Sequence, residues 1–116
     1  PRLSPDGTTI VFASQMNVGG LTSSSFNIWK MSATDGSGAT ALTTVRTASR
    51  DSINPHYSPD GTKIVFESLM SIGATTTTSS NIWLMNSDGT SQTSLTSNTN
   101  AGLGCNLSTA GVWYAP

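Results

Sequence analysis

Apolar residues occur along this chain in short runs and not at helical spacing. Residues 64–68 (IVFES) and 81–85 (NIWLM) are rich in β-branched and aromatic side chains and are bounded by turn-forming residues, a pattern typical of β-strands. Two more strands are predicted at residues 54–57 and around residues 92–95. The pattern therefore predicts an all-β fold of short antiparallel strands joined as a meander.

The predicted strands are apolar on both faces. Because side chains alternate along a strand, Ile82 and Leu84 point to one face and Trp83 and Met85 to the other. A sheet with one face in water would alternate apolar with polar residues. We therefore expect a sheet that is covered on both sides, and one that exposes broad apolar surface if nothing covers it.

Most of the chain is one pattern written twice. The stretch SPDGTTIVFAS at residues 4–14 returns as SPDGTKIVFES at residues 58–68, and nine of the eleven positions are identical. Asn27 recurs as Asn81, 54 positions later, and one extra residue then sets Asp35-Gly36 against Asp88-Gly89. We divide the chain into a first repeat at residues 1–53, a second at residues 54–110 and an extra inner strand at residues 111–116.

The Ser-Pro-Asp-Gly stretch before each long strand predicts a turn. Pro59 presets φ, Asp60 accepts hydrogen bonds from the backbone ahead of it, and Gly61 adopts the positive φ that closes the turn. The same chemistry is expected in the first repeat and after the second long strand. The predicted turn residues are Pro5, Asp6, Gly7, Pro59, Asp60, Gly61, Asp88 and Gly89.

Taken in order, the motifs P-x-[aromatic]-SPDG-x-x-I-V-F-x-S, N-I-W-x-M-x-x-D-G and L-T resemble the repeat of TolB-like β-propellers. These WD-like blades also occur beside peptidase domains of the prolyl oligopeptidase class. The resemblance covers residues 4–44 and 55–96 and implies four-stranded blades stacked on their neighbours. The chain departs from the family pattern in the long connection at residues 70–80 and at residues 97–111, which fit no part of it.

Two such blades do not close a ring, since propellers contain about 4–8 blades. One expectation is a segment of a longer propeller, and a second is a symmetric ring of several copies. In the third, the strand with Val112, Trp113 and Tyr114 completes the first blade of another chain by strand addition, and a filament grows if the contact does not close. The sequence leaves these alternatives open.

Composition and charge narrow the choice of partners. The net charge is −1 and the five Lys and Arg residues are scattered, so the chain lacks the basic stripe of a nucleic-acid-binding protein. No apolar stretch approaches the ~20 residues of a membrane span. The surface is rich in Ser and Thr and poor in charge, which favours an exported protein in the periplasm or outside the cell.

Residues that could carry catalysis are few. Four of the six acidic residues precede glycine in predicted turns, so no metal site is expected. His56 is the only histidine, Cys105 the only thiol, and no serine lies in a nucleophile motif. We predict no catalytic residue, no metal and no cofactor.

One set of residues predicts a binding site. Arg2, His56 and Trp113 occupy the same position in three successive inner strands, and inner strands line the channel of a propeller. Two stretches are candidates for glycosylation. Residues 75–80 read as an exposed, Ser/Thr-rich loop tip, and Asn106-Leu107-Ser108 fits the N-glycosylation sequon.

The resemblance implies a non-enzymatic function, as an exported protein-interaction or structural scaffold. Self-assembly into a ring or filament by strand exchange is one form that this function can take. The alternative is the non-catalytic propeller portion of a larger prolyl-oligopeptidase-like hydrolase. A downstream segment with a G-x-S-x-G motif would favour the hydrolase, whereas further blades and a signal peptide would favour the scaffold. Fold analogy alone does not decide between them.

Overall fold

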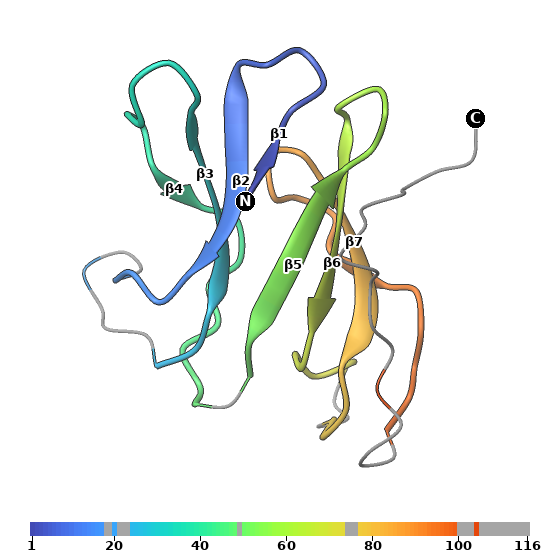
Figure 1. Cartoon of the computed structure of the whole chain (residues 1–116). Coiled ribbons are helices and arrows are strands. Elements are labelled where there is room, and N and C mark those ends of the chain that lie inside the picture. Colours follow the sequence, from blue (N-terminus) through green and yellow to red (C-terminus); the bar gives the residue numbers. More distant parts are fainter. Residues whose placement is uncertain (18–19, 21–23, 49, 74–76, 100–103, 105–116) are drawn as a thin grey trace.

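The computed structural model describes residues 1–17, 20, 24–48, 50–73, 77–99 and 104. Within these residues the chain forms eight β-strands and no helix, arranged as two four-stranded antiparallel sheets (Figure 1). The prediction of an all-β fold is confirmed. Neither sheet closes on itself.

Each sheet is a meander, because strands that follow one another in the chain are neighbours in the sheet. The first sheet consists of β1 (Arg2–Leu3), β2 (Thr9–Ser14), β3 (Asn27–Ser32) and β4 (Thr40–Ala41). The second sheet consists of β5 (Ser52–Tyr57), β6 (Lys63–Ser68), β7 (Asn81–Asn86) and β8 (Thr93–Ser94). The second sheet thus begins at Ser52, slightly before the repeat boundary expected at residue 54.

The two sheets repeat the same strand register. Ile10 pairs with Met31 and Phe12 with Trp29 in the first sheet. Their counterparts pair in the same way in the second sheet, Ile64 with Met85 and Phe66 with Trp83. Equivalent residues of the two repeats therefore occupy equivalent places.

The sheets differ at their inner strands. β1 pairs with β2 through Arg2 and Leu3 only, whereas β5 pairs along β6 from Ser52 to Tyr57. A β-bulge interrupts β5 between Ile53 and His56, and Asn54 within it has a φ of 53°. Asparagine is among the residues that tolerate this left-handed conformation.

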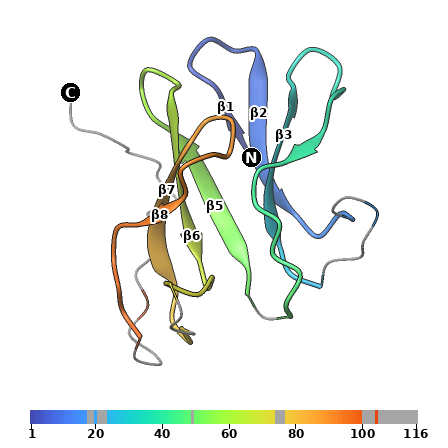
Figure 2. The ribbon, with the colours of Figure 1, turned by 180° about the vertical axis from the view of Figure 1, so that it is seen from behind.

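The two sheets share one hydrophobic core. Each sheet has an inner face, which lies against the other sheet, and an outer face (Figure 1, Figure 2). The inner face of the first sheet carries Val11, Ala13, Ile28 and Leu42, and that of the second carries Tyr57, Ile64, Phe66, Trp83 and Met85. The rings of Phe66 and Trp83 stack with centroids 6.4 Å apart.

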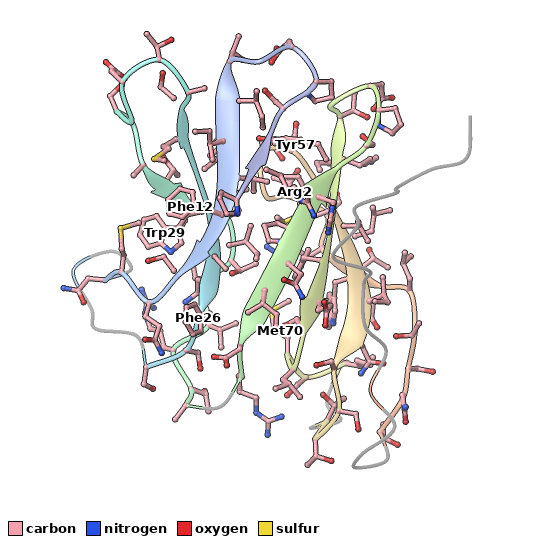
Figure 3. All side chains as sticks on the ribbon, viewed as in Figure 1. Arg2, Phe12, Phe26, Trp29, Tyr57 and Met70 are labelled. Atoms are coloured by element: carbon pink, nitrogen blue, oxygen red, sulfur yellow. The ribbon has the colours of Figure 1, made fainter. Side chains whose placement is uncertain are left out.

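The outer faces hold the remaining apolar positions of the strands. The outer face of the first sheet carries Leu3, Ile10, Phe12, Trp29 and Met31. Phe12 and Trp29 lie together on the side of β2 that faces away from β5 (Figure 3). The outer face of the second sheet carries Val65, Ile82, Leu84 and Leu95. Both sheets are thus apolar on both faces, as the alternation predicts.

A buried asparagine at the start of the third strand of each sheet fixes the chain that follows the fourth strand. Asn27 Oδ1 accepts hydrogen bonds from Thr43 Oγ1 (2.9 Å) and Val45 N (2.7 Å), and its Nδ2 donates to Val45 O (2.9 Å). Asn81 makes the equivalent bonds with Thr96 and Asn98. Both asparagines are fully buried.

The connection between β6 and β7 differs from the sequence-based expectation. Thr77 and Ser79 are buried, so the expectation of an exposed loop tip is wrong for these two residues. Thr77 O accepts a hydrogen bond from Arg50 Nη1, which also donates to Leu69 O (3.2 Å). The Arg50 side chain thus holds this segment, and a buried threonine is not an accessible glycosylation site.

Candidate functional site

A groove of about 800 Å³ lies where the Pro-Asp-Gly turns of the two sheets meet. It brings together side chains from both repeats, which are far apart in the sequence. The polar and charged residues along it include Asp6, Lys30, Tyr57, Asp60 and Ser87.

The two groove carboxylates are engaged by their own turns. Asp60 Oδ1 accepts hydrogen bonds from Ser58 Oγ (2.7 Å), Thr62 N (3.0 Å) and Thr62 Oγ1 (2.8 Å). Asp6 makes the same three bonds with Ser4 and Thr8. Gly7 and Gly61 both have a φ of 75°, the left-handed conformation that glycine adopts without strain.

These bonds stabilise the ionised carboxylates. The backbone amide of Thr62, followed by the Ser58 and Thr62 hydroxyls, lowers the pKa of Asp60 to about 2. The pKa of Asp6 is also lowered, chiefly by the Ser4 hydroxyl. Both groups are therefore anionic at neutral pH and unsuited to act as general acids, which need a pKa near the working pH.

Tyr57 is the other titratable group on the groove with a shifted pKa. Burial raises the pKa of its hydroxyl, and the negative charge of Asp6 adds to the effect. The hydroxyl therefore stays protonated and can donate a hydrogen bond. The groove can bind polar groups, but its described lining residues include neither histidine nor cysteine to act as base or nucleophile.

A second cleft, of about 570 Å³, lies between the inner strands. Arg2 and His56, two of the three predicted binding residues, line it together with Phe12, Asn54 and Pro55. Arg2 pairs with Val11 and His56 with the equivalent Val65, so both stand at the same place in their sheets. The third predicted residue, Trp113, lies outside the described residues, as do Val112 and Tyr114.

The environment of His56 keeps its imidazole neutral. The side chain is only 7% exposed. Burial lowers the pKa of His56, the positive charge of Arg2 lowers it further, and Glu67 opposes them. Glu67 is itself buried and accepts a hydrogen bond from Asn54 Nδ2. A neutral imidazole next to a cation and a buried carboxylate can recognise polar groups, and the position of Glu67 was not anticipated from the sequence.

The outer face of the first sheet is a third surface feature. Leu3 is 58% exposed, and Ile10, Phe12 and Met31 are partly exposed. The alternation along the strands predicted such apolar surface. Phe12 lies on this exposed face, whereas Phe66, the equivalent residue of the second repeat, lies in the core.

No metal-binding or membrane-spanning element is found in the described part of the chain. Its His, Cys, Asp and Glu side chains form no group of three that could hold a metal ion. In the same residues no helix is long and apolar enough to cross a membrane. Comparison of the sequence with models of protein families and with curated proteins finds no match.

Proposed function

We propose that the chain is a non-enzymatic module of the TolB-like β-propeller type. It acts as a protein-interaction or structural scaffold in the periplasm or outside the cell, and it self-assembles into a ring or filament. The observation that carries this proposal is the face-to-face packing of two equivalent sheets whose outer faces are also apolar.

The side-chain chemistry supports a non-enzymatic role. The groove carboxylates accept hydrogen bonds from their own turns, and His56 is buried and held neutral. A hydrolytic site would need a nucleophile, a base and an orienting group within reach of one another. The groove and the cleft offer polar contacts without such a set among their described residues.

Exposed apolar surface supports self-assembly. A contiguous apolar patch on a folded protein marks an interaction surface. The strand with Val112, Trp113 and Tyr114, which lies outside the described residues, is proposed to add to the sheet of a neighbouring copy. Arg2, His56 and Trp113 are proposed to face a ligand or partner at the inner strands.

Sedimentation equilibrium of the purified chain tests the proposal. We expect a mass above the 12.0 kDa of the single chain, rising with concentration. Phe12→Ser, on the outer face of the first sheet, should lower the mass. Phe26→Ser is the matched control, because Phe26 is exposed but precedes β3 and does not belong to that face. A folded 12.0 kDa species at every concentration would contradict self-assembly.

A further inference from the structure

We propose that the outer face of the first sheet binds the outer face of the second sheet in a second copy of this chain. This inference rests on the proposed scaffold function and names the partner of its apolar surface. The contact between copies repeats the contact that the two sheets make within one chain.

The first support is a difference in burial between equivalent residues. Ile64, Phe66 and Met85 are fully or almost fully buried where the second sheet meets the first. Their counterparts on the outer face of the first sheet are only partly buried, and Leu3, the counterpart of Tyr57, is 58% exposed. Trp29 is the exception, since it is as buried as its counterpart Trp83. The other residues of this outer face thus resemble those of an interface that has no partner sheet.

The second sheet shows the reciprocal difference at two positions, although Val65, the counterpart of Val11, is itself buried. Leu42 is 5% exposed and Ile28 is fully buried on the inner face of the first sheet. Leu95, the counterpart of Leu42, is 56% exposed, and Ile82, the counterpart of Ile28, is partly exposed. The outer face of the first sheet is therefore the counterpart of the inner face of the second sheet, and the outer face of the second is the counterpart of the inner face of the first. The two inner faces already pack against each other.

Close contacts between the sheets involve two turn glycines. A Cβ placed on Gly89 would lie 3.0 Å from Leu42 O and 3.4 Å from Leu42 Cβ. A Cβ on Gly61 would lie 3.5 Å from Pro5 Cδ. Glycine at position 89 lets this turn of the second sheet approach Leu42, whereas a Cβ on Gly61 would make an ordinary contact with Pro5.

The counterparts of these glycines in the first sheet have no such neighbours. A Cβ on Gly7 would meet nothing within 4 Å, and one on Gly36 would meet only Met31 Sδ at 3.8 Å. Transferring the internal contacts to a pair of copies places Gly36 of one copy against Leu95 of the next. It also places Gly7 of one copy against Pro59 of the next.

Two of the differences between the internal interface and the interface between copies bear on its strength. Gln92 Nε2 donates a hydrogen bond to Leu42 O (2.8 Å) across the internal interface, and the counterpart of Gln92 is Ala39, which has no side-chain donor. Glu67, on the outer face of the second sheet, stands where the inner face of the first sheet has Ala13. We therefore expect the contact between copies to be weaker than the contact within the chain.

The contact is head-to-tail, since two different surfaces meet. Repetition of one head-to-tail contact gives a ring if the rotation closes and an open filament if it does not. Either assembly has every internal sheet covered on both faces, as the alternation along the strands requires.

Disulfide trapping tests the inference directly. In a Cys105→Ser background, one protein carries Gly36→Cys and a second carries Leu95→Cys. Because the internal counterparts place two Cβ positions 3.4 Å apart, near the ~3.5–4.5 Å of a disulfide, oxidised glutathione should join the two proteins covalently. We expect a band at twice the chain mass on a non-reducing gel, which dithiothreitol removes.

The control uses the same chemistry at another turn glycine. Gly7→Cys mixed with Leu95→Cys should give no more than the background level of covalent pairs. Gly7 has nearly the same φ as Gly36 (75° and 74°), so the two substitutions strain the backbone alike, but Gly7 does not face Leu95. Absence of the Gly36–Leu95 covalent pair in proteins that fold and assemble would overturn the inference while leaving the scaffold function intact.

A charge substitution keeps the inference testable if a cysteine variant misfolds. Leu95→Asp places a carboxylate on the outer face of the second sheet. Because Leu95 is exposed, the fold should be kept, and association should weaken by at least roughly tenfold. Ala48→Asp, at an exposed residue outside both faces, adds the same charge and should have no such effect. Unchanged association of Leu95→Asp would contradict the proposed interface, whereas a chain that never associates would contradict the scaffold function itself.

Discussion

At the residue scale, the aspartates that precede glycine in turns act as turn residues, although Asp6 and Asp60 line the same groove. Asp6 and Asp60 make the same three hydrogen bonds at the same distances. Asp88 likewise accepts hydrogen bonds from Thr90 N (3.0 Å) and Thr90 Oγ1 (2.6 Å). Because these hydrogen bonds favour the charged carboxylate, the stability of the fold depends on the ionisation of the aspartates.

We predict an acid-dependent loss of stability at Asp60. The pKa of Asp60 is about 2 in the folded chain and 3.8 as its ordinary value, so the folded state favours the ionised form. Its contribution is complete above the ordinary value and is lost as the pH falls through about 2. Urea unfolding from pH 5 to 2 measures this.

Asp60→Asn is the matched comparison, because asparagine keeps the shape of the side chain and does not titrate. The stability difference between the native chain and Asp60→Asn should shrink as the pH falls. A difference that is the same at pH 5 and pH 2 would contradict this role for the carboxylate.

His56 should respond to pH in the same direction but in a higher range. The pKa of His56 is lowered from 6.5, first by burial and then by Arg2, so the unfolded chain binds the proton more readily. Stability should therefore fall as the pH drops below about 6.5 and His56→Gln should flatten this part of the profile. The pH dependence of thermal unfolding between pH 8 and 5 measures it, and a parallel profile for both proteins would refute the assignment.

At the element scale, the strands could be predicted from local residue chemistry. The side-chain hydrogen bonds that join the strands to distant segments could not. Turn formers and β-branched runs predicted both meanders, because each depends on neighbours in the sequence. The bonds of Asn27 to Thr43 and Val45 join residues 16 and 18 positions apart, and that of Arg50 to Thr77 spans 27. The repetition of Asn27 as Asn81 was visible in the sequence, but not the buried role it marks.

Removing one of these asparagines should destabilise the corresponding sheet. Asn27→Ala removes the side chain that bonds Val45 N, Val45 O and the buried Thr43 Oγ1, and loss of a hydrogen-bond partner at a buried polar group costs about 1–3 kcal/mol. Chemical denaturation measures the loss. Thr44→Ala, at an exposed neighbouring residue, is the control, and equal stability of the two variants would contradict the role of Asn27.

At the scale of the whole molecule, the repeat explains both the core and the exposed surface. Arg2 and His56 have equivalent positions in the two repeats and line one cleft, and their role in binding stays a prediction. The hydrogen bond from Asn54 to the buried Glu67 was not predicted, because Asn54 lies in a bulge that the sequence did not indicate. Equivalent residues can thus be located from the sequence, while their surroundings depend on how the sheets pack.

The two equivalent phenylalanines should respond differently to the same substitution. Phe66→Ala empties a fully buried site and should cost about 3–5 kcal/mol of unfolding free energy. Phe12→Ala removes a partly exposed ring and should cost the dissociated chain about 1–2 kcal/mol, with its larger effect on association. Denaturation at low concentration, combined with sedimentation, separates the two effects, and equal losses of stability would contradict the asymmetry.

Electron microscopy of the assembled chain shows which surfaces meet between copies. We predict rings or filaments in which successive sheets stack face to face, with Gly36 of one copy beside Leu95 of the next. Single isolated chains, or copies that meet only through the β4 and β8 edges of their sheets, would contradict it.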